Sequence, residues 1–273
     1  MSRIHPTAVI HPRAELADDA VIGPFCVIGD RVTVGGGTIV ESHTVICGPT
    51  RIGARCRIGP MAALGGDGQF RGAVPESSWL IVGDETIVRE GVSLHRSIKE
   101  GEATRIGNRC YIMATAHVGH DCQVGDDVTL ANAVLLAGHV SVGDRAFIGG
   151  LSGIHQFCRI GRLAIVGGFE VARKDVPPFA AYVHGGLKAY NAIGCRRAGM
   201  DAKAIRAVRA AYQQIHSHRS ARGAADAIEA SDSSGVAEVR EIVDFLRSGK
   251  RGITASCRFA RRADSSHAGE ATD

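Results

Sequence analysis

Histidines and one aspartate recur in a short central part of the chain, and their types indicate acid–base chemistry. His120 and Asp121 are adjacent in the string HVGHDC (117–122), and His139 and His155 follow further along. A histidine with a pKa near neutrality can take a proton from a hydroxyl, while a carboxylate fixes its tautomer. The residues therefore favour His120 as a general base with Asp121 as its partner, if the fold brings the two side chains together.

Two other interpretations of the histidines stay open at this point. Histidines are common zinc ligands, although no repeated ligand spacing accompanies them and the eight cysteines contain no C-x-x-C pair. Histidines are also found singly on polar outer faces.

An acyl transfer further requires a donor for the oxyanion. Gly138 can present its backbone N–H for this, although a plain corner glycine would explain the residue equally well.

A six-residue repeat defines the elements that must position these side chains. Aliphatic residues recur at every sixth position over 4–64, 82–94 and 106–166. Six residues fit a short strand and a corner, so three faces make a coil of about 18 residues, and coils stack about 4.8 Å apart. The repeat predicts a triangular prism of about eight coils, with the aliphatic side chains inside.

The same repeat places the histidines on one face of the prism. Val118, Leu136 and Ile154 are 18 residues apart, so their hexads stack in one column. We expect the histidines around these positions to lie within about 5–12 Å of one another: His117, His120, His139 and His155. Five cysteines fall four residues after an aliphatic position, which predicts packing rather than redox or metal chemistry: Cys26, Cys56, Cys110, Cys122 and Cys158.

The repeat also predicts how the chain is divided. Residues 1–178 form the prism, and the interruptions at 65–81 and 95–105 are loops directed outward, where recognition tends to lie. Apolar residues at helical spacing, after a capping Asp201, predict a small helical domain over 179–253. The polar tail 254–273 is expected to be disordered.

Composition excludes several classes of protein. The chain is 45% hydrophobic and contains 35 glycines, whereas only 5% of it is aromatic, which fits many tight repeated corners. It has no apolar run of about 18 residues and no signal-peptide core, so a cytoplasmic protein without a transmembrane segment is expected. The net charge of +4 is too small to argue for a nucleic-acid partner.

The histidine strings identify a family. HVGHDC (117–122), LAGHVSVGD (136–144), GIHQFC (153–158) and DVPPF (175–179) resemble the UDP-N-acetylglucosamine acyltransferases that begin lipid A synthesis, and the likeness extends over about residues 4–253. The resemblance implies an all-β, left-handed parallel β-helix followed by a small α-helical C-terminal domain, assembled as a homotrimer with active sites between subunits. It also implies acyl carrier protein as donor, a UDP-amino sugar as acceptor, and no metal or cofactor.

Carried over position by position, the resemblance implies a role for each site residue. His120 is the general base, Asp121 its orienting carboxylate and Gly138 the oxyanion donor. The substrates contact Gln69, His95, His117, His139, His155, Gln156, Gly168 and Arg197. Among these, Arg197 contacts the nucleotide phosphates. Gly168 occupies the position whose size limits the length of the acyl chain, and the bulky Phe169 beside it narrows the groove.

Some of the residues that the resemblance implies for binding the acceptor are altered. The family's first outward loop carries Gln-Asp-Leu-Lys-Tyr, whereas this chain has QFRGA over 69–73, and the arginine that normally follows Arg197 is Ala198. Three alternatives therefore remain open: N-acylation of a UDP-diamino sugar, a non-catalytic binding paralogue, and a zinc enzyme resembling the trimeric carbonic anhydrases.

Overall fold

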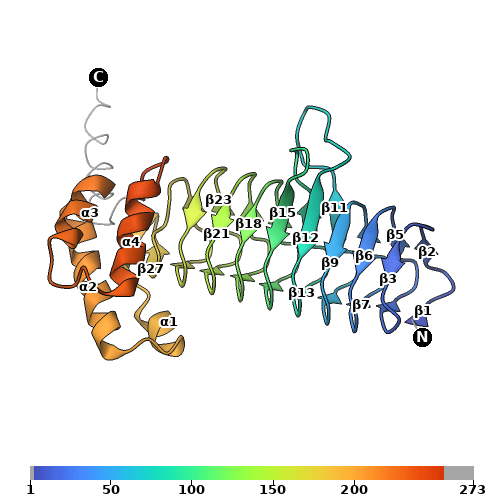
Figure 1. Ribbon diagram of the computed structural model, residues 1–273, viewed down its shortest axis with the longest axis horizontal. Coiled ribbons are helices and arrows are strands. Elements are labelled where there is room, and N and C mark those ends of the chain that lie inside the picture. Colours follow the sequence, from blue (N-terminus) through green and yellow to red (C-terminus); the bar gives the residue numbers. More distant parts are fainter. Residues whose placement is uncertain (1–2, 255–273) are drawn as a thin grey trace, which may run out of the picture.

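A computed structural model, which describes residues 3–254, has the form of a long prism with helices at its C-terminal end (Figure 1). Short strands joined by tight turns form three parallel sheets, one on each face of the prism. The fold is a left-handed parallel β-helix, and the predicted fold class is confirmed by the structural relatives described below.

The strands follow one another around the three faces, so every third strand lies in the same sheet. The first sheet contains β1 (Arg3–Ile4), β4 (Val21–Ile22), β7 (Ile39–Val40), β10 (Arg57–Ile58), β13 (Ile87–Val88), β16 (Tyr111–Ile112), β19 (Thr129–Leu130), β22 (Phe147–Ile148), β25 (Ile165–Val166), β27 (Ala180–Val183) and β28 (Gly186–Tyr190). The second contains β2 (Val9–Ile10), β5 (Val27–Ile28), β8 (Val45–Ile46), β11 (Ala63–Gly66), β14 (Ser93–His95), β17 (His117–Val118), β20 (Leu135–Leu136), β23 (Gly153–Ile154) and β26 (Val171–Ala172). The third contains β3 (Glu15–Leu16), β6 (Val32–Val34), β9 (Thr50–Ile52), β12 (Trp79–Val82), β15 (Ala103–Ile106), β18 (Gln123–Val124), β21 (Ser141–Val142) and β24 (Arg159–Ile160).

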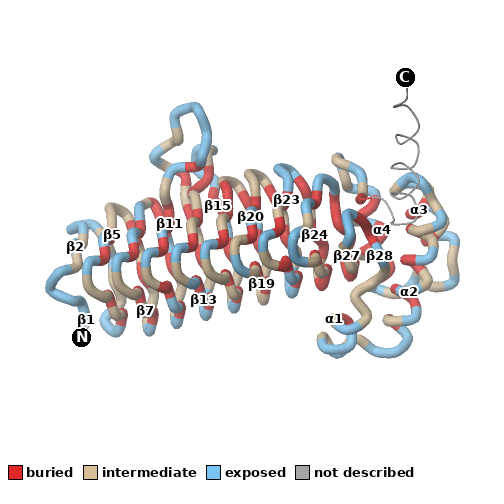
Figure 2. The backbone as a smooth tube through the Cα atoms, turned by 180° about the vertical axis from the view of Figure 1, so that it is seen from behind, coloured by how far each residue is buried: buried red, intermediate tan, exposed pale blue. Residues whose placement is uncertain are grey.

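The stacking register agrees with the predicted coil of 18 residues. Val118 pairs with Leu136 and Leu136 with Ile154, so the histidine-bearing hexads form one column of the second sheet. The repeated aliphatic residues from Ile22 onward point inward and are almost completely buried, as the recurring buried positions in Figure 2 show. All five cysteines of the small-residue position are buried free thiols, in agreement with their predicted packing role.

The corners of the prism depend on residues in the left-handed backbone region. Non-glycine residues with positive φ recur at the turns, among them Asp121 (60°), His139 (62°) and Phe157 (64°). Because such a residue bends the chain sharply, one hexad can end and the next can start on another face. Side chains at these corners need not alternate as they do along a strand.

Two loops leave the prism between β11 and β12 and between β14 and β15 (Figure 1). They comprise residues 67–78, called the first loop below, and residues 96–102, called the second loop. Both lie inside the intervals expected from the sequence, because strands β11, β12, β14 and β15 extend into the predicted interruptions.

The C-terminal end begins with strands rather than helices. Residues 180–190, expected in the helical domain, form the antiparallel pair β27–β28, and β27 continues the first sheet of the prism. The helices are α1 (Ala192–Arg197), α2 (Ala202–Ser217), α3 (Ala221–Glu229) and α4 (Ala237–Ser248). Asp201 caps α2 as predicted, by accepting from Ala204 N at 2.7 Å.

Polar contacts attach the helices to the last coils. The Arg162 guanidinium pairs with Glu241 of α4 at 2.7 Å, and the buried Tyr212 hydroxyl donates to Pro178 O at 2.6 Å. No helix in the described range 3–254 is long and apolar enough to cross a membrane. The tail that was predicted to be disordered lies outside the described residues, apart from Thr254.

Candidate active site

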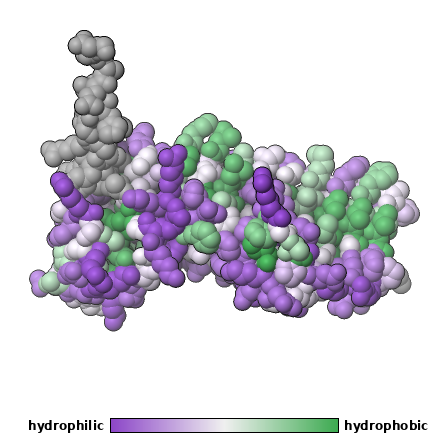
Figure 3. Space-filling view, turned by 90° about the horizontal axis from the view of Figure 1, so that it is seen from above, coloured by the Kyte–Doolittle hydropathy of each residue, from purple (hydrophilic) through white to green (hydrophobic). Residues whose placement is uncertain are grey.

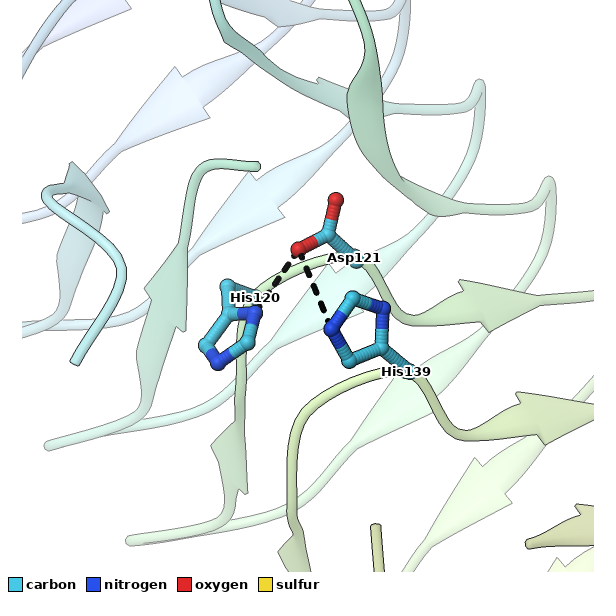
Figure 4. A group of neighbouring side chains, drawn as sticks. All are labelled: His120, Asp121 and His139. Carbon is cyan, nitrogen blue, oxygen red and sulfur yellow. Dashed lines mark hydrogen bonds and ion pairs between the residues drawn. The ribbon is translucent and has the colours of Figure 1, made fainter. Parts of the chain in front are cut away.

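His120 and Asp121 form a hydrogen-bonded pair at the corner between β17 and β18. His120 Nδ1 lies 2.7 Å from Asp121 Oδ2 (Figure 4). An ionised carboxylate only accepts, so Nδ1 carries the proton and Nε2 presents its lone pair. Neighbours on a flat strand would face opposite ways, but the positive φ of Asp121 turns its carboxylate back toward the ring. The predicted acid–base pair is therefore formed geometrically.

The Asp121 carboxylate is 7% exposed and has three further partners. The Ser97 hydroxyl lies 2.6 Å from Oδ1, Ile98 N donates to Oδ2 at 3.4 Å, and His139 Nε2 lies 3.8 Å from Oδ2. Burial alone would raise the pKa of this carboxyl, but the hydrogen bonds from Ser97 and His120 outweigh it, and the pKa lies below its ordinary value. Asp121 is therefore ionised at neutral pH.

His139 is held beside the pair by two aromatic contacts. Its ring meets the His120 ring edge-on at 5.0 Å and stacks on Phe157 at 4.5 Å, with an angle of 6° between the planes. Burial lowers the pKa of His139 more than the charge of Asp121 raises it. A neutral ring is thus favoured next to His120, where a second positive charge would oppose proton uptake.

Gly138 lies directly against the His120 ring. A Cβ built at this position would be 2.6 Å from both His120 Cε1 and Nε2, which is below any real contact distance. The Gly138 N–H also donates to no other group in the part of the chain that the structure describes. Close packing on His120 explains why this corner residue is glycine.

An open groove of about 700 Å³ runs along the second sheet in front of this pair. It contains six of the predicted site residues: Gln69, His117, His120, Gly138, His155 and Gln156. Apolar or backbone surface completes its lining: Gly119, Leu135, Ala137, Gly153, Ile154 and Val171. Leu135 and Val171 are each 54% exposed, so the groove combines polar groups with accessible hydrophobic surface.

His95 and His117 form a second pair of rings near one end of the groove. Their centroids are 5.1 Å apart. His95 Nδ1 donates to Asp67 O at 2.6 Å, and His117 Nδ1 lies 2.9 Å from the Ser93 hydroxyl. His95 therefore joins the first loop to the strand that carries the groove.

The pH dependence of His117 follows from its burial. Burial and the neighbouring His95 lower its pKa below 6.5. Its neutral form therefore stabilises the fold fully above pH 6.5, and this stabilisation is lost as the pH falls through the folded-state pKa. We expect an NMR titration midpoint for His117 below 6.5, and a smaller loss of unfolding free energy between pH 7 and pH 5 in H117Q than in the wild type. A midpoint at or above 6.5 would contradict this.

Arg96 anchors the first loop, which carries Gln69. Its guanidinium binds Asp67 Oδ1 through Nη2 at 2.6 Å and Nε at 2.9 Å, and its Nη1 donates to Pro75 O at 2.7 Å and to the Ser78 hydroxyl at 3.0 Å. The arginine is 7% exposed. Because a buried charge is costly without its partners, these bonds fix both ends of the first loop against β14.

Two predicted substrate contacts lie away from this groove. Gly168 lies one coil after Gly150. A Cβ built at Gly168 would come close only to the Gly150 backbone, at 3.3 Å. Arg197 is exposed at the end of α1, and its guanidinium makes no hydrogen bond or ion pair with another of the described residues. The single chain thus brings together His95, His117, His120, Asp121, Gly138 and His139 with the rest of the groove, but not Arg197.

Several residues of the site have no signal in the sequence. Ser97 and Arg96 lie in an irregular loop, where neither period nor motif singles them out, and their partners are distant in sequence. Phe157 could have been noticed, because it follows His155 by two residues and lies one coil above His139.

Ligand atoms of His120, Asp121 and His139 lie within 4.8 Å of one another, so these three side chains could hold a metal ion. His120 Nδ1 is also 2.7 Å from Asp121 Oδ2, a hydrogen-bond distance. The same arrangement also fits a histidine oriented by a carboxylate.

Comparisons with known proteins agree with the fold. A model of the bacterial transferase hexapeptide repeat matches residues 103–138, and a model described as Udp N-acetylglucosamine O-acyltransferase, Domain 2, matches residues 175–254. A prism of hexapeptide repeats with a histidine-lined groove defines the chain as a hexapeptide-repeat acyltransferase.

Individual relatives identify the family. The acyl-[acyl-carrier-protein]–UDP-N-acetylglucosamine O-acyltransferase of Alkalilimnicola ehrlichii is 43% identical over 199 residues, which are 70% of this chain and 76% of that protein. The solved structure of LpxA from Acinetobacter baumannii is 39% identical, covers 92% of this chain and 99% of its own, and has a TM-score of 0.87. The UDP-N-acetylglucosamine acyltransferase of Arabidopsis is 31% identical with a TM-score of 0.81, over 92% and 99% of the two chains. The chain belongs to the UDP-N-acetylglucosamine O-acyltransferase family.

Proposed function

We propose that this chain transfers a 3-hydroxyacyl group from acyl carrier protein to the sugar 3-hydroxyl of UDP-N-acetylglucosamine, the first step of lipid A synthesis, with His120 as general base. The observation that carries the proposal is the 2.7 Å contact between His120 Nδ1 and Asp121 Oδ2, which leaves Nε2 free in the groove. Family membership supplies the reaction class, and this contact supplies the base.

In the proposed mechanism, His120 Nε2 takes the proton of the sugar hydroxyl as its oxygen attacks the thioester carbonyl. The ring then carries a positive charge, which the ionised Asp121 stabilises at hydrogen-bond distance. His139 adds no opposing charge, because its lowered pKa keeps it neutral.

The tetrahedral intermediate carries a negative oxygen, for which the Gly138 N–H is the proposed donor. As the intermediate collapses, the C–S bond breaks and the new C–O ester bond remains. The departing thiolate takes the proton from His120 Nε2, so the enzyme returns to its starting state. No cofactor is required for this balance, as the family resemblance implies.

The substrate-contact roles proposed for Gln69, His117, His155 and Gln156 fit their places in the groove, and His95 lies against His117. The role proposed for Gly168, which lies outside the groove, rests on the family resemblance. The groove is open toward solvent, and apolar side chains such as Leu135 and Val171 remain exposed on it. Figure 3 shows further hydrophobic surface over the prism, whereas the surface over the helical domain is mostly hydrophilic. We propose that neighbouring copies in a homotrimer cover the groove and bring Arg197 to the nucleotide phosphates, which would exclude water during transfer.

The seven cysteines among residues 3–254 are all free thiols, six of them buried. Free thiols persist in reducing compartments, which supports a cytoplasmic location.

Five exposed basic residues on α2 and near the start of α3 are proposed to dock the acidic carrier protein: Lys203, Arg206, Arg209, Arg219 and Arg222. Complementary charge raises association rates and is screened by salt. We expect the KM for the acyl carrier to rise with ionic strength, and R206E to raise it about threefold or more. R240E makes the same charge change at an exposed residue of α4 and is the matched control. A KM unaffected by salt, or equal effects of the two variants, would contradict docking on α2.

The acceptor is tested by mass spectrometry of products from a panel of acyl carriers and UDP-sugars. We expect an ester on UDP-N-acetylglucosamine. An amide formed only on the 3-amino analogue would establish the alternative acceptor suggested by the altered first loop. Nucleotide binding without any product would establish a non-catalytic paralogue. Activity that follows the content of stoichiometric zinc would establish the metal-dependent alternative.

A further inference from the structure

Ser97 is completely buried at the start of the second loop, directly beside the proposed catalytic pair. Its hydroxyl oxygen accepts from the Lys99 backbone N–H at 3.0 Å and lies 2.6 Å from Asp121 Oδ1. The other acceptor within reach, Lys99 O, is 3.5 Å away. The single hydroxyl hydrogen is therefore directed to Asp121 Oδ1, because that acceptor is both charged and much closer.

The two oxygens of the Asp121 carboxylate consequently have different partners. Oδ1 accepts from Ser97, and Oδ2 accepts from His120 Nδ1 at 2.7 Å. Rotation of the carboxylate would break both bonds together. Without the serine hydroxyl, Oδ1 would lose its short partner, and either oxygen could turn toward the histidine or toward solvent.

The serine itself is fixed by the first loop. Arg96 N donates to Gly66 O at 3.0 Å, and Ser97 N donates to Trp79 O at 3.1 Å. Gly66 and Trp79 lie immediately before and after the first loop. Arg96 and Ser97, two consecutive residues of the second loop, are therefore bonded to the two ends of the first loop. The position of the Ser97 hydroxyl is thus set by the segment that carries Gln69 as well as by its own loop.

We propose that Ser97 is a positioning residue for acyl transfer: its hydroxyl holds the Asp121 carboxylate in the orientation in which Oδ2 faces His120 Nδ1. The substrate does not touch Ser97 in this proposal. The serine acts through Asp121 on the tautomer and orientation of the base, and the inference rests on the proposed role of His120.

The first test is steady-state kinetics of S97A. The substitution removes one oxygen atom, and we expect kcat to fall about tenfold, the usual effect of one hydrogen bond to a charged group, while the KM for UDP-N-acetylglucosamine stays within about twofold. T38V is the matched control, because Thr38 is also completely buried, donates to Gly53 O and accepts from Cys56 N, far from the groove. A kcat for S97A within about twofold of the wild type, or a decrease no larger than that of T38V, would overturn the proposal.

The second test is the tautomer of His120 in the resting enzyme, read from ¹⁵N chemical shifts. The His120 signals among the 12 histidines are identified by their loss in H120A. We expect the Nδ1-protonated tautomer in the wild type and a measurable population of the Nε2-protonated tautomer in S97A. An unchanged tautomer in S97A would overturn the proposal even if kcat falls, and a different tautomer in the wild type would overturn it without any variant.

H120A in the same kinetic assay separates this inference from the proposed function. If H120A retains the wild-type kcat, the proposed role of His120 itself is refuted. If H120A loses activity while S97A keeps the wild-type kcat and tautomer, only the role of Ser97 fails.

Discussion

H120A is expected to lower the kcat of acyl transfer by about two to four orders of magnitude, the usual contribution of a positioned general base. In the proposed mechanism no other side chain can take over, because Asp121 is ionised but directed at Nδ1 rather than into the groove. His139 faces Asp121 through its Nε2 and is stacked on Phe157. The sugar hydroxyl would have to lose its proton to water.

Product formation per unit time, measured by mass spectrometry at saturating substrates, tests this expectation. H43A is the control, since His43 is an exposed histidine in an early coil, 5.0 Å from Phe25 and outside the groove. Thermal denaturation of both variants excludes unfolding as the cause. A rate for H120A close to that of the wild type would refute the assignment of the base.

G138A is expected to lower kcat by about two to three orders of magnitude, comparable to the loss of an oxyanion donor. The added methyl carbon would lie 2.6 Å from His120 Nε2, so the ring must move away from the position in which it can accept the proton. Movement of the corner backbone would also displace the Gly138 N–H. Because Gly138 is not among the residues with positive φ, alanine causes no backbone strain there, and the fold should persist.

Kinetics and nucleotide binding should separate in this variant: kcat falls strongly, while UDP-N-acetylglucosamine still binds. G235A is the control, because a Cβ at Gly235 meets nothing within 4 Å. If G138A retained more than about a tenth of the wild-type kcat, the close contact between position 138 and the His120 ring could not be important for the reaction.

The prism was predictable because its period maps directly onto its geometry. A hexad is one strand and one corner, so positions 18 residues apart must be neighbours in one sheet, as Val118, Leu136 and Ile154 are. The presence of His120 and His139 on one wall follows from this periodicity. The left-handed coil does not follow from it, since the same period could serve either hand, and it came from the family resemblance.

The contacts that turn this wall into a site depend on tertiary structure. The positive φ of Asp121 recurs at the corners with the six-residue period, but the partners that orient its carboxylate, Ser97 and His120, are decided by the folded chain. Ser97 and Arg96 come from a loop whose conformation is set by hydrogen bonds to Gly66, Trp79 and Asp67, all distant in sequence. The first residues of the predicted helical domain instead form β27 and β28, because the edge of the first sheet offers them hydrogen bonds that a local helical pattern cannot reveal.

The amino-acid sequence alone therefore determined the coil, its inward aliphatic residues and the column of imidazoles, because all three follow from counting in steps of six. The folded structure decided which nitrogen of His120 is free, what holds its carboxylate partner and why position 138 has no side chain. Those properties depend on ångström-scale distances between segments that only the folded chain brings together.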